Sequence, residues 1–188
     1  MRHKYDTRGL VLARMHVGEA NTIVIVLTPD LGLVHARAQS LRKPGAKLAA
    51  ALATLVESDV VLVRGKEGWR ITGAVLRENW FERLGNKETR VRASRVSGLF
   101  LRLVAGETPD TELFPIMRGF LEALAQLPTE SHEAAEILAV LRTLAVLGLD
   151  TGEIPGGADF SSPLLATVFK DRALYVARIN AGIAASGL

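Results

Sequence analysis

Residues 7–41 decide the fold of this chain, and they read TRGLVLARMHVGEANTIVIVLTPDLGLVHARAQSL. They contain three runs that are rich in β-branched residues and too short for typical helices. These runs are residues 9–17, 22–28 and 33–39. Gly18 can supply a positive φ in the first connection, while Pro29 presets φ in the second and Gly32 closes it. We therefore expect three strands joined by tight turns.

The third run alternates, and this gives the expected strand an inner and an outer face. Its small apolar residues Val34, Ala36 and Ala38 recur at every second position. If they point inward, Arg37 lies on the outer face. The basic loop 41–47, LRKPGAK, follows directly. The pattern predicts a cationic surface at the end of this strand.

Two more strands are expected at 55–64 and 69–77, with a hairpin loop at 65–68. Residues 48–54 form a short helical turn or an irregular segment. Five short strands with this interruption are typical of a small oligonucleotide-binding (OB) barrel. The strong curvature of such a barrel needs bends, and Gly9, Gly32 and Gly73 are candidates for them.

From residue 80 onward the apolar residues recur with a helical period. We expect three helices, at about 91–104, 111–127 and 133–147, with Ser131 as the N-cap of the third. A loop rich in glycine and proline follows at 150–160, and then a tail of one or two short helices. The sequence thus predicts an α+β protein. A five-stranded OB-fold β-barrel at 1–80 precedes an α-helical bundle domain at 81–188.

The composition excludes several classes of site. The 188 residues include no cysteine, and the four histidines are scattered. Disulfides and thiolate metal sites are therefore excluded, and no metal or other cofactor is expected. No run is long enough to span a membrane and the N-terminus lacks a secretory signal, which favours a cytoplasmic, nucleoid-associated protein without membrane partners.

The positive charge gathers in the first half of the chain. Residues 1–83 hold 13 Lys and Arg against 8 Asp and Glu, whereas the remainder holds 10 against 12. This asymmetry suggests that the first half binds polyanions. No Walker loop, nucleophile elbow or paired-histidine helix is present, so the sequence favours a binding protein over an enzyme.

The candidate DNA-binding residues are the cations of the expected barrel and one tryptophan. They are Arg2, Lys4, Arg37, Arg42, Lys43, Lys47, Arg64, Lys66, Trp69 and Arg70. Lysines and arginines bind phosphates and release counterions, and aromatic rings stack on bases. Other interpretations stay open. The N-terminal cations and the 41–47 loop could be merely solvated, and Trp69 could plug the barrel end, with Tyr5 as the second stacking candidate.

The cations of the first expected helix, Lys87, Arg90, Arg92 and Arg95, are more typical of a solvated face than of a continued DNA path.

The motifs of the first half resemble those of the RecO family. The matching segments are 7–12 (TRGLVL), 18–24 (GEANTIV), 27–28 with 32–34, 36–38 (ARA), 42–43 (RK) and 50–52 (AAL). Asn21 stands where the family usually has Asp. The segments 109–114 (PDTELF) and 141–149 (LRTLAVLGL) resemble family helices. The resemblance covers about residues 5–150.

This resemblance implies an OB fold followed by a helical domain. It further implies binding and annealing of single-stranded DNA, with double-stranded DNA as a further candidate ligand. The implied partners are RecR and single-stranded-DNA-binding protein, in the loading of RecA. Many relatives carry a four-cysteine zinc module after the helix that matches 141–149. This chain has no cysteine, so we expect a short variant without that module.

The leading hypothesis is therefore a non-enzymatic mediator of DNA repair and recombination that binds single-stranded DNA. The first rival is an adaptor of a repair complex whose barrel contacts a partner protein. The second is an enzyme with a cleft between barrel and bundle. Arg142, beside the apolar helix 133–147, is a guess for the cation that would bind the acidic tail of single-stranded-DNA-binding protein.

Overall fold

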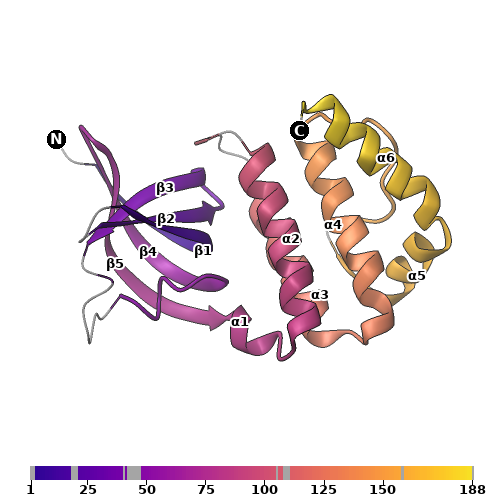
Figure 1. The fold of residues 1–188 in the computed structure, drawn as a ribbon, viewed down its shortest axis with the longest axis horizontal. Coiled ribbons are helices and arrows are strands. Elements are labelled where there is room, and N and C mark those ends of the chain that lie inside the picture. The colour runs from indigo at the N-terminus through magenta and orange to yellow at the C-terminus, as the bar shows by residue number, and fades with distance from the viewer. Residues whose placement is uncertain are drawn as a thin grey trace. The chain divides into compact units, whose positions relative to one another are not determined.

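The computed structural model describes residues 3–17, 21–39, 41, 48–104, 106–107, 111–157 and 159–187. The chain divides into two compact units (Figure 1). The first, the barrel unit, comprises Met1–Arg83 with Ala105–Phe114, and the second, the helical unit, comprises Leu84–Val104 with Pro115–Leu188. The domain ranges expected from the sequence, 1–80 and 81–188, stay predictions.

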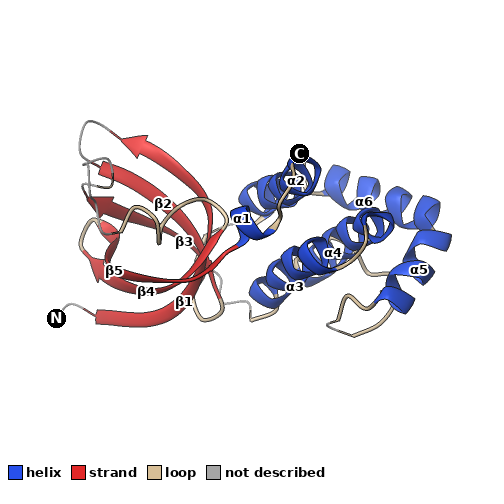
Figure 2. Cartoon of the chain, turned by 90° about the horizontal axis from the view of Figure 1, so that it is seen from below, coloured by secondary structure: helices blue, strands red, loops and turns tan. Residues whose placement is uncertain are grey.

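Five strands form the barrel unit, as the sequence predicts. They are β1 (His3–Val17), β2 (Asn21–Thr28), β3 (Gly32–Gln39), β4 (Val56–Gly65) and β5 (Gly68–Asn79). They close into a barrel in the order β1-β2-β3-β5-β4, in which only the β3–β5 pairing is parallel. Figure 2 shows the strands curving round a common axis. The architecture is the predicted α+β one, with an N-terminal OB-fold barrel followed by helices.

The pairing register is staggered round the barrel, so that a row of paired residues does not close on itself. One row of directly paired residues starts at Lys4 on β1, crosses β4, β5, β3 and β2, and returns to β1 at Met15. This offset along a single strand is the shear that a closed barrel requires. Register shifts between Val11 and Ala13 and between Val61 and Leu62 mark bulges that sharpen the curvature.

The turns form where the sequence places them. Gly32 adopts φ 68°, and the Thr28 hydroxyl donates to the Gly32 carbonyl at 3.1 Å while it accepts the Leu31 N–H at 3.0 Å. At the β4–β5 hairpin, Gly68 adopts φ 98° after the two tip residues. Residues 48–54 make a single helical turn, with Leu52 N–H bonded to Leu48 O at 3.0 Å.

The barrel core consists of side chains that alternate along the strands. Val34, Ala36 and Ala38 all point inward, as predicted, together with β2 residues such as Val24. Gly9 allows the close packing of β1, because a Cβ there would lie 2.4 Å from Val26 Cγ1. Gly32 and Gly9 therefore serve a turn and a close approach, respectively.

The short helix α1 (Trp80–Arg83) ends the barrel unit. The Trp80 ring is fully buried and its indole N–H donates to the buried carboxylate of Glu57 at 3.2 Å, while the Arg83 guanidinium lies over the ring. Arg8 pairs with the same carboxylate at 3.5 Å. A buried carboxylate needs such partners, so this cluster stabilises the barrel rather than forming a binding site.

The helical unit is built round α4 (His132–Val146). The other helices are α2 (Lys87–Leu103), α3 (Leu113–Gln126), the 3-10 turn η1 (Thr129–Ser131), α5 (Ser162–Lys170) and α6 (Arg172–Ala185). Helix α4 contacts α2, α5 and α6, and it is buried on nearly all sides. A helix that is apolar all round belongs in a core.

One detail of the helical unit differs from the expectation. Ser131 precedes α4, but its side chain makes no capping hydrogen bond, because the preceding 3-10 turn places it in a helical conformation. In the tail, Leu165 and Val168 are buried, whereas Phe169, Leu174 and Val176 are exposed. None of the helices in the described ranges is long and apolar enough to cross a membrane.

Candidate nucleic-acid interface

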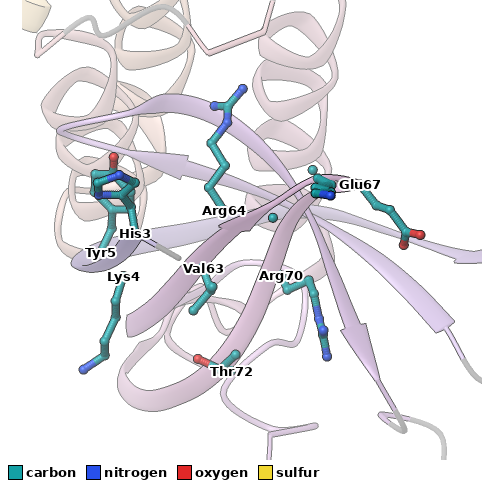
Figure 3. A pocket seen from close by; sticks show the side chains of 11 residues that line it. His3, Lys4, Tyr5, Val63, Arg64, Glu67, Arg70 and Thr72 are labelled. Atoms are coloured by element: carbon teal, nitrogen blue, oxygen red, sulfur yellow. The ribbon is translucent and has the colours of Figure 1, made fainter. Parts of the chain in front are cut away.

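A hollow of about 850 Å³ lies where the start of β1 meets the β4–β5 hairpin (Figure 3). Six of its lining residues, five from the strands and one from the hairpin tip, carry charge or an aromatic ring. They are His3, Lys4, Tyr5, Arg64, Glu67 and Arg70. Lys66, at the hairpin tip, completes the basic rim. The hollow therefore gathers four of the predicted site residues, Lys4, Arg64, Lys66 and Arg70, from β1 and the β4–β5 hairpin.

The outer face of this region carries a row of cations. Lys4 pairs in register with Val63, Val63 with Arg70, and Arg70 with Arg37, so these residues follow one another across β1, β4, β5 and β3. Neighbouring strands lie about 4.8 Å apart, so the row spans about 14 Å. In Figure 3, Lys4, Val63 and Arg70 lie on one side of the ribbon of strands. The register thus brings together three predicted site residues that are far apart in the sequence.

The other face of the same strands carries an aromatic cluster. The Arg64 guanidinium lies 5.1 Å from the centre of the Trp69 ring, and Tyr5 meets that ring edge-on with centroids 5.2 Å apart. Such cation–π and edge-to-face contacts are favourable and fix the geometry of the side chains. The cluster caps this end of the barrel core.

Trp69 itself is not available as a stacking platform, which corrects its assignment as a DNA-contact residue. Its side chain is 5% exposed and belongs to the barrel core, the second of the two interpretations that the sequence left open. The neighbouring Tyr5 is 38% exposed and lines the hollow. An exposed ring supported by a buried one is the better candidate for base stacking.

Four predicted site residues lie outside the described residues. They are Arg2, Arg42, Lys43 and Lys47. Their assignment as phosphate-binding residues stays a prediction. Within the described ranges, Lys66 and Arg70 are exposed, and neither forms an ion pair with another described residue.

Carboxylates that sequence analysis missed lie beside the other cations. Arg37 Nη1 lies 3.2 Å from Glu67 Oε2, Arg64 forms an ion pair with Glu107, and Lys4 Nζ lies 3.1 Å from Asp6 Oδ2. Glu67 and Glu107 are 30 and 43 positions away from their arginines. No local pattern relates residues at such separations, so only the three-dimensional structure shows these pairs.

The cations of α2 have a structural task. The guanidinium of Arg95 binds the Glu136 carboxylate with two bonds of 2.7 Å, and Arg92 donates to the same carboxylate at 2.7 Å. The hydrogen bond to Glu136 raises the pKa of Arg95 above its usual value. These arginines fasten α2 to α4, which argues against their use as a continued DNA path.

Arg142 is likewise occupied within the helical unit. Its guanidinium donates to the Asp159 carbonyl at 2.8 Å and lies over the Phe160 ring at 4.7 Å. Burial lowers the pKa of this guanidinium. An acidic tail would have to displace these contacts, so the structure gives the guess about Arg142 no support.

The glycine-rich loop at 150–160 surrounds an arginine of the protein itself. Arg178 donates from Nε to Asp150 Oδ1 at 3.1 Å and from Nη1 to the Glu153 carbonyl at 2.8 Å. Gly152 leaves room for this guanidinium, because a Cβ there would lie 2.4 Å from Nη2. The hydrogen bond to Asp150 raises the pKa of Arg178. Among the residues of known placement, no cluster of three metal-binding side chains occurs.

Comparisons with known proteins agree with this architecture. Residues 1–80 match the family model described as Recombination protein O N terminal. A DNA repair protein RecO of Dehalococcoides mccartyi is 30% identical over 122 residues, which cover 65% of this chain and 48% of that protein. Those of Acaryochloris marina and a Nostoc species are each 29% identical, over 78% and 79% of this chain and 49% and 51% of their own lengths.

The chain thus spans about half the length of the curated relatives it matches. The family match falls on the closed barrel, and the longer alignments continue through much of the helical unit. These matches show that the barrel unit is similar to the N-terminal part of RecO proteins and that the similarity extends into the helical unit.

Proposed function

We propose that this chain binds single-stranded DNA through its barrel, as a non-enzymatic protein of DNA repair and homologous recombination. The observation that carries the proposal is the row formed by Lys4, Arg70 and Arg37, which the strand register aligns on the outside of an OB barrel. OB folds bind oligonucleotides on the face of strands 2 and 3 and at the loops between strands 1 and 2 and between strands 4 and 5. Arg37 on β3 and the β4–β5 hairpin beside Arg70 belong to that region.

In this proposal, phosphates lie along the cation row on the outer face, and bases contact the exposed Tyr5 ring on the other face, where it lines the hollow. Lys66 adds a cation at the hairpin tip, and the cations of the 41–47 loop follow β3 in the sequence. Electrostatic contacts of this kind are independent of sequence and weaken as salt rises. The names of the relatives support the further proposal that the bound strand is a repair intermediate.

The test is a salt titration of a fluorescent oligothymidine with charge-reversed variants. Replacing Lys66 and Arg70 by glutamate should lower the affinity by about tenfold or more at low salt and should flatten the salt dependence, because each lost phosphate contact removes about 0.7 from the slope. The control is Lys170→Glu, an exposed cation of α5 in the helical unit. If the control weakens binding as much, the barrel face is not the binding site.

The 41–47 loop is tested separately with Arg42→Glu and Lys43→Glu. We expect a loss comparable to that of the barrel variants, because these cations follow the β3 strand of the same face. An unchanged affinity and an unchanged salt slope would remove the loop from the site while leaving the barrel row in place.

The finer activities belong to the same proposal. We infer that the chain anneals complementary strands and acts with RecR and single-stranded-DNA-binding protein in the loading of RecA. An annealing assay with two complementary oligonucleotides, with and without the partner proteins, measures both points. Binding without annealing would confine the chain to strand recognition.

A second candidate function is a protein-binding adaptor. It is favoured by the exposed apolar residues Val75 and Leu76 on β5, of which Val75 is 65% exposed. Exposed apolar side chains of this kind suit a protein partner better than a phosphate backbone. The adaptor predicts retention of a repair protein with no retention on single-stranded DNA at low salt.

A further inference from the structure

Three cations of the candidate interface are already paired with carboxylates in the free protein. Arg37 is paired with Glu67, Arg64 with Glu107 and Lys4 with Asp6. The first two carboxylates come from outside the strands that carry their arginines. Glu67 lies at the tip of the β4–β5 hairpin, and Glu107 lies in the segment between α2 and α3 that belongs to the barrel unit.

A carboxylate in this position resembles a phosphate. Both groups present oxygen acceptors to the same guanidinium N–H groups, and both form charge-assisted hydrogen bonds with them. A phosphate oxygen that approaches Arg37 or Arg64 therefore meets a guanidinium N–H group that is already hydrogen-bonded to a carboxylate. Binding at these two positions requires an exchange of one anion for another.

These pairs are placed so that an exchange is feasible. The Glu67 side chain is 83% exposed, and both arginines are also in contact with solvent. Exposed ion pairs contribute little to stability, because water and salt compete with them. The carboxylates can therefore leave without disturbing the barrel core. In contrast, a buried pair would resist displacement.

We propose that Glu67 and Glu107 occupy two phosphate positions of the barrel in the free protein, so that single-stranded DNA binds by displacing them and these carboxylates set its affinity and salt dependence. This inference rests on the proposed function. It predicts that the salt slope of the unmodified protein is smaller than the number of its cations implies, since an internal anion replaces part of the released counterions.

The experiment measures oligothymidine binding by fluorescence anisotropy across a salt series. Glu67→Gln and Glu107→Gln keep the size of the side chain and remove its charge. Each should tighten binding by about three- to tenfold at low salt and should steepen the salt slope by about 0.7, the value of one additional phosphate contact on a single strand. Glu130→Gln, with the same charge change on the exposed η1 turn of the helical unit, is the matched control.

A double-mutant cycle separates a local effect from a general one. In the background of Arg37→Gln, the gain from Glu67→Gln should disappear, because the cation that it frees is gone. If Glu67→Gln still raises the affinity in that background, or if Glu130→Gln raises it equally, the effect comes from the net charge of the protein. Either result would overturn the inference. No gain from either glutamate variant would overturn it as well.

Binding of oligothymidine by the unmodified chain distinguishes a failure of the further inference from a failure of the proposed function. If this chain binds oligothymidine and the glutamate variants bind no more tightly, the inference fails and the proposed function stands. If the unmodified chain binds no single strand at low salt, while the Lys66 and Arg70 variants behave identically to it, the proposed function fails and the inference fails with it.

Discussion

Arginines serve opposite purposes in the two units of this protein. In the barrel unit, Arg37 and Arg64 are paired with carboxylates that solvent reaches, as the exposed Glu67 illustrates. In the helical unit, Arg92 and Arg95 share the Glu136 carboxylate, which is only 17% exposed. The Arg37 and Arg64 ion pairs of the barrel unit are thus replaceable, whereas the ion pairs of Glu136 in the helical unit are structural. Exposure of the carboxylate, rather than the presence of the arginine, separates the two cases.

The largest expected effect comes from the shared carboxylate of the helical unit. Glu136→Gln should reduce the free energy of unfolding by about 2–3 kcal/mol, at the lower end for a broken buried pair because Arg95 remains partly exposed. Urea unfolding monitored by circular dichroism measures this loss. Glu67→Gln, the matched change in the barrel unit, should alter the stability by less than about 0.5 kcal/mol. Equal losses would abolish the distinction between the two units.

A smaller effect is expected from the loop that surrounds Arg178. Gly152→Ala places a Cβ against a guanidinium that Asp150 and the Glu153 carbonyl hold in place, so the pair must shift. We expect a loss of about 1–2 kcal/mol in thermal or urea unfolding. Gly157→Ala in the same loop meets no atom within 4 Å and should be neutral. If Gly152→Ala is also neutral, the loop is less firmly bound to Arg178 than the contacts indicate.

The smallest expected effect is a difference between Arg70 and Arg37 of the barrel unit in their contribution to oligothymidine binding. Arg70 has no ion-pair partner among the described residues, whereas Arg37 has Glu67. Arg70→Gln should therefore weaken oligothymidine binding by about three- to eightfold at 0.1 M salt, and Arg37→Gln by about twofold or less. Anisotropy titrations of both variants give the comparison directly. A larger loss for Arg37→Gln would mean that its pair with Glu67 offers no competition to DNA.

Much of the barrel could be predicted from the sequence because its signals are local. The alternation of Val34, Ala36 and Ala38 and the turn at Pro29 depend on neighbours a few residues apart. The start of β1 was missed for the opposite reason. Residues 3–8 are polar and exposed, and they become a strand only because β4 pairs with them about 55 residues later in the chain.

The candidate site was predictable only in part. The cations could be named from their clustering, and Arg37 could be placed on the outer face of its strand. The register that aligns Arg37 with Arg70 and Lys4 depends on barrel closure, which no local pattern encodes. The burial of Trp69 and the positions of Glu67 and Glu107 also depend on closure. Long-range pairing was therefore the main limit on the prediction.

The pairing of strands that are distant in the sequence has a consequence for the order in which the barrel folds. The β1–β2, β2–β3 and β4–β5 pairs join strands that are adjacent in sequence, whereas the β1–β4 and β3–β5 pairs must close long loops. Loop closure carries an entropic cost, so the hairpins form first and these two seams form last. The segment 3–8 lies on one seam, and it carries Lys4 and Tyr5. Its backbone amides should therefore exchange hydrogen earlier than those of β2, so that two residues of the proposed DNA site belong to the part of the barrel that opens most readily.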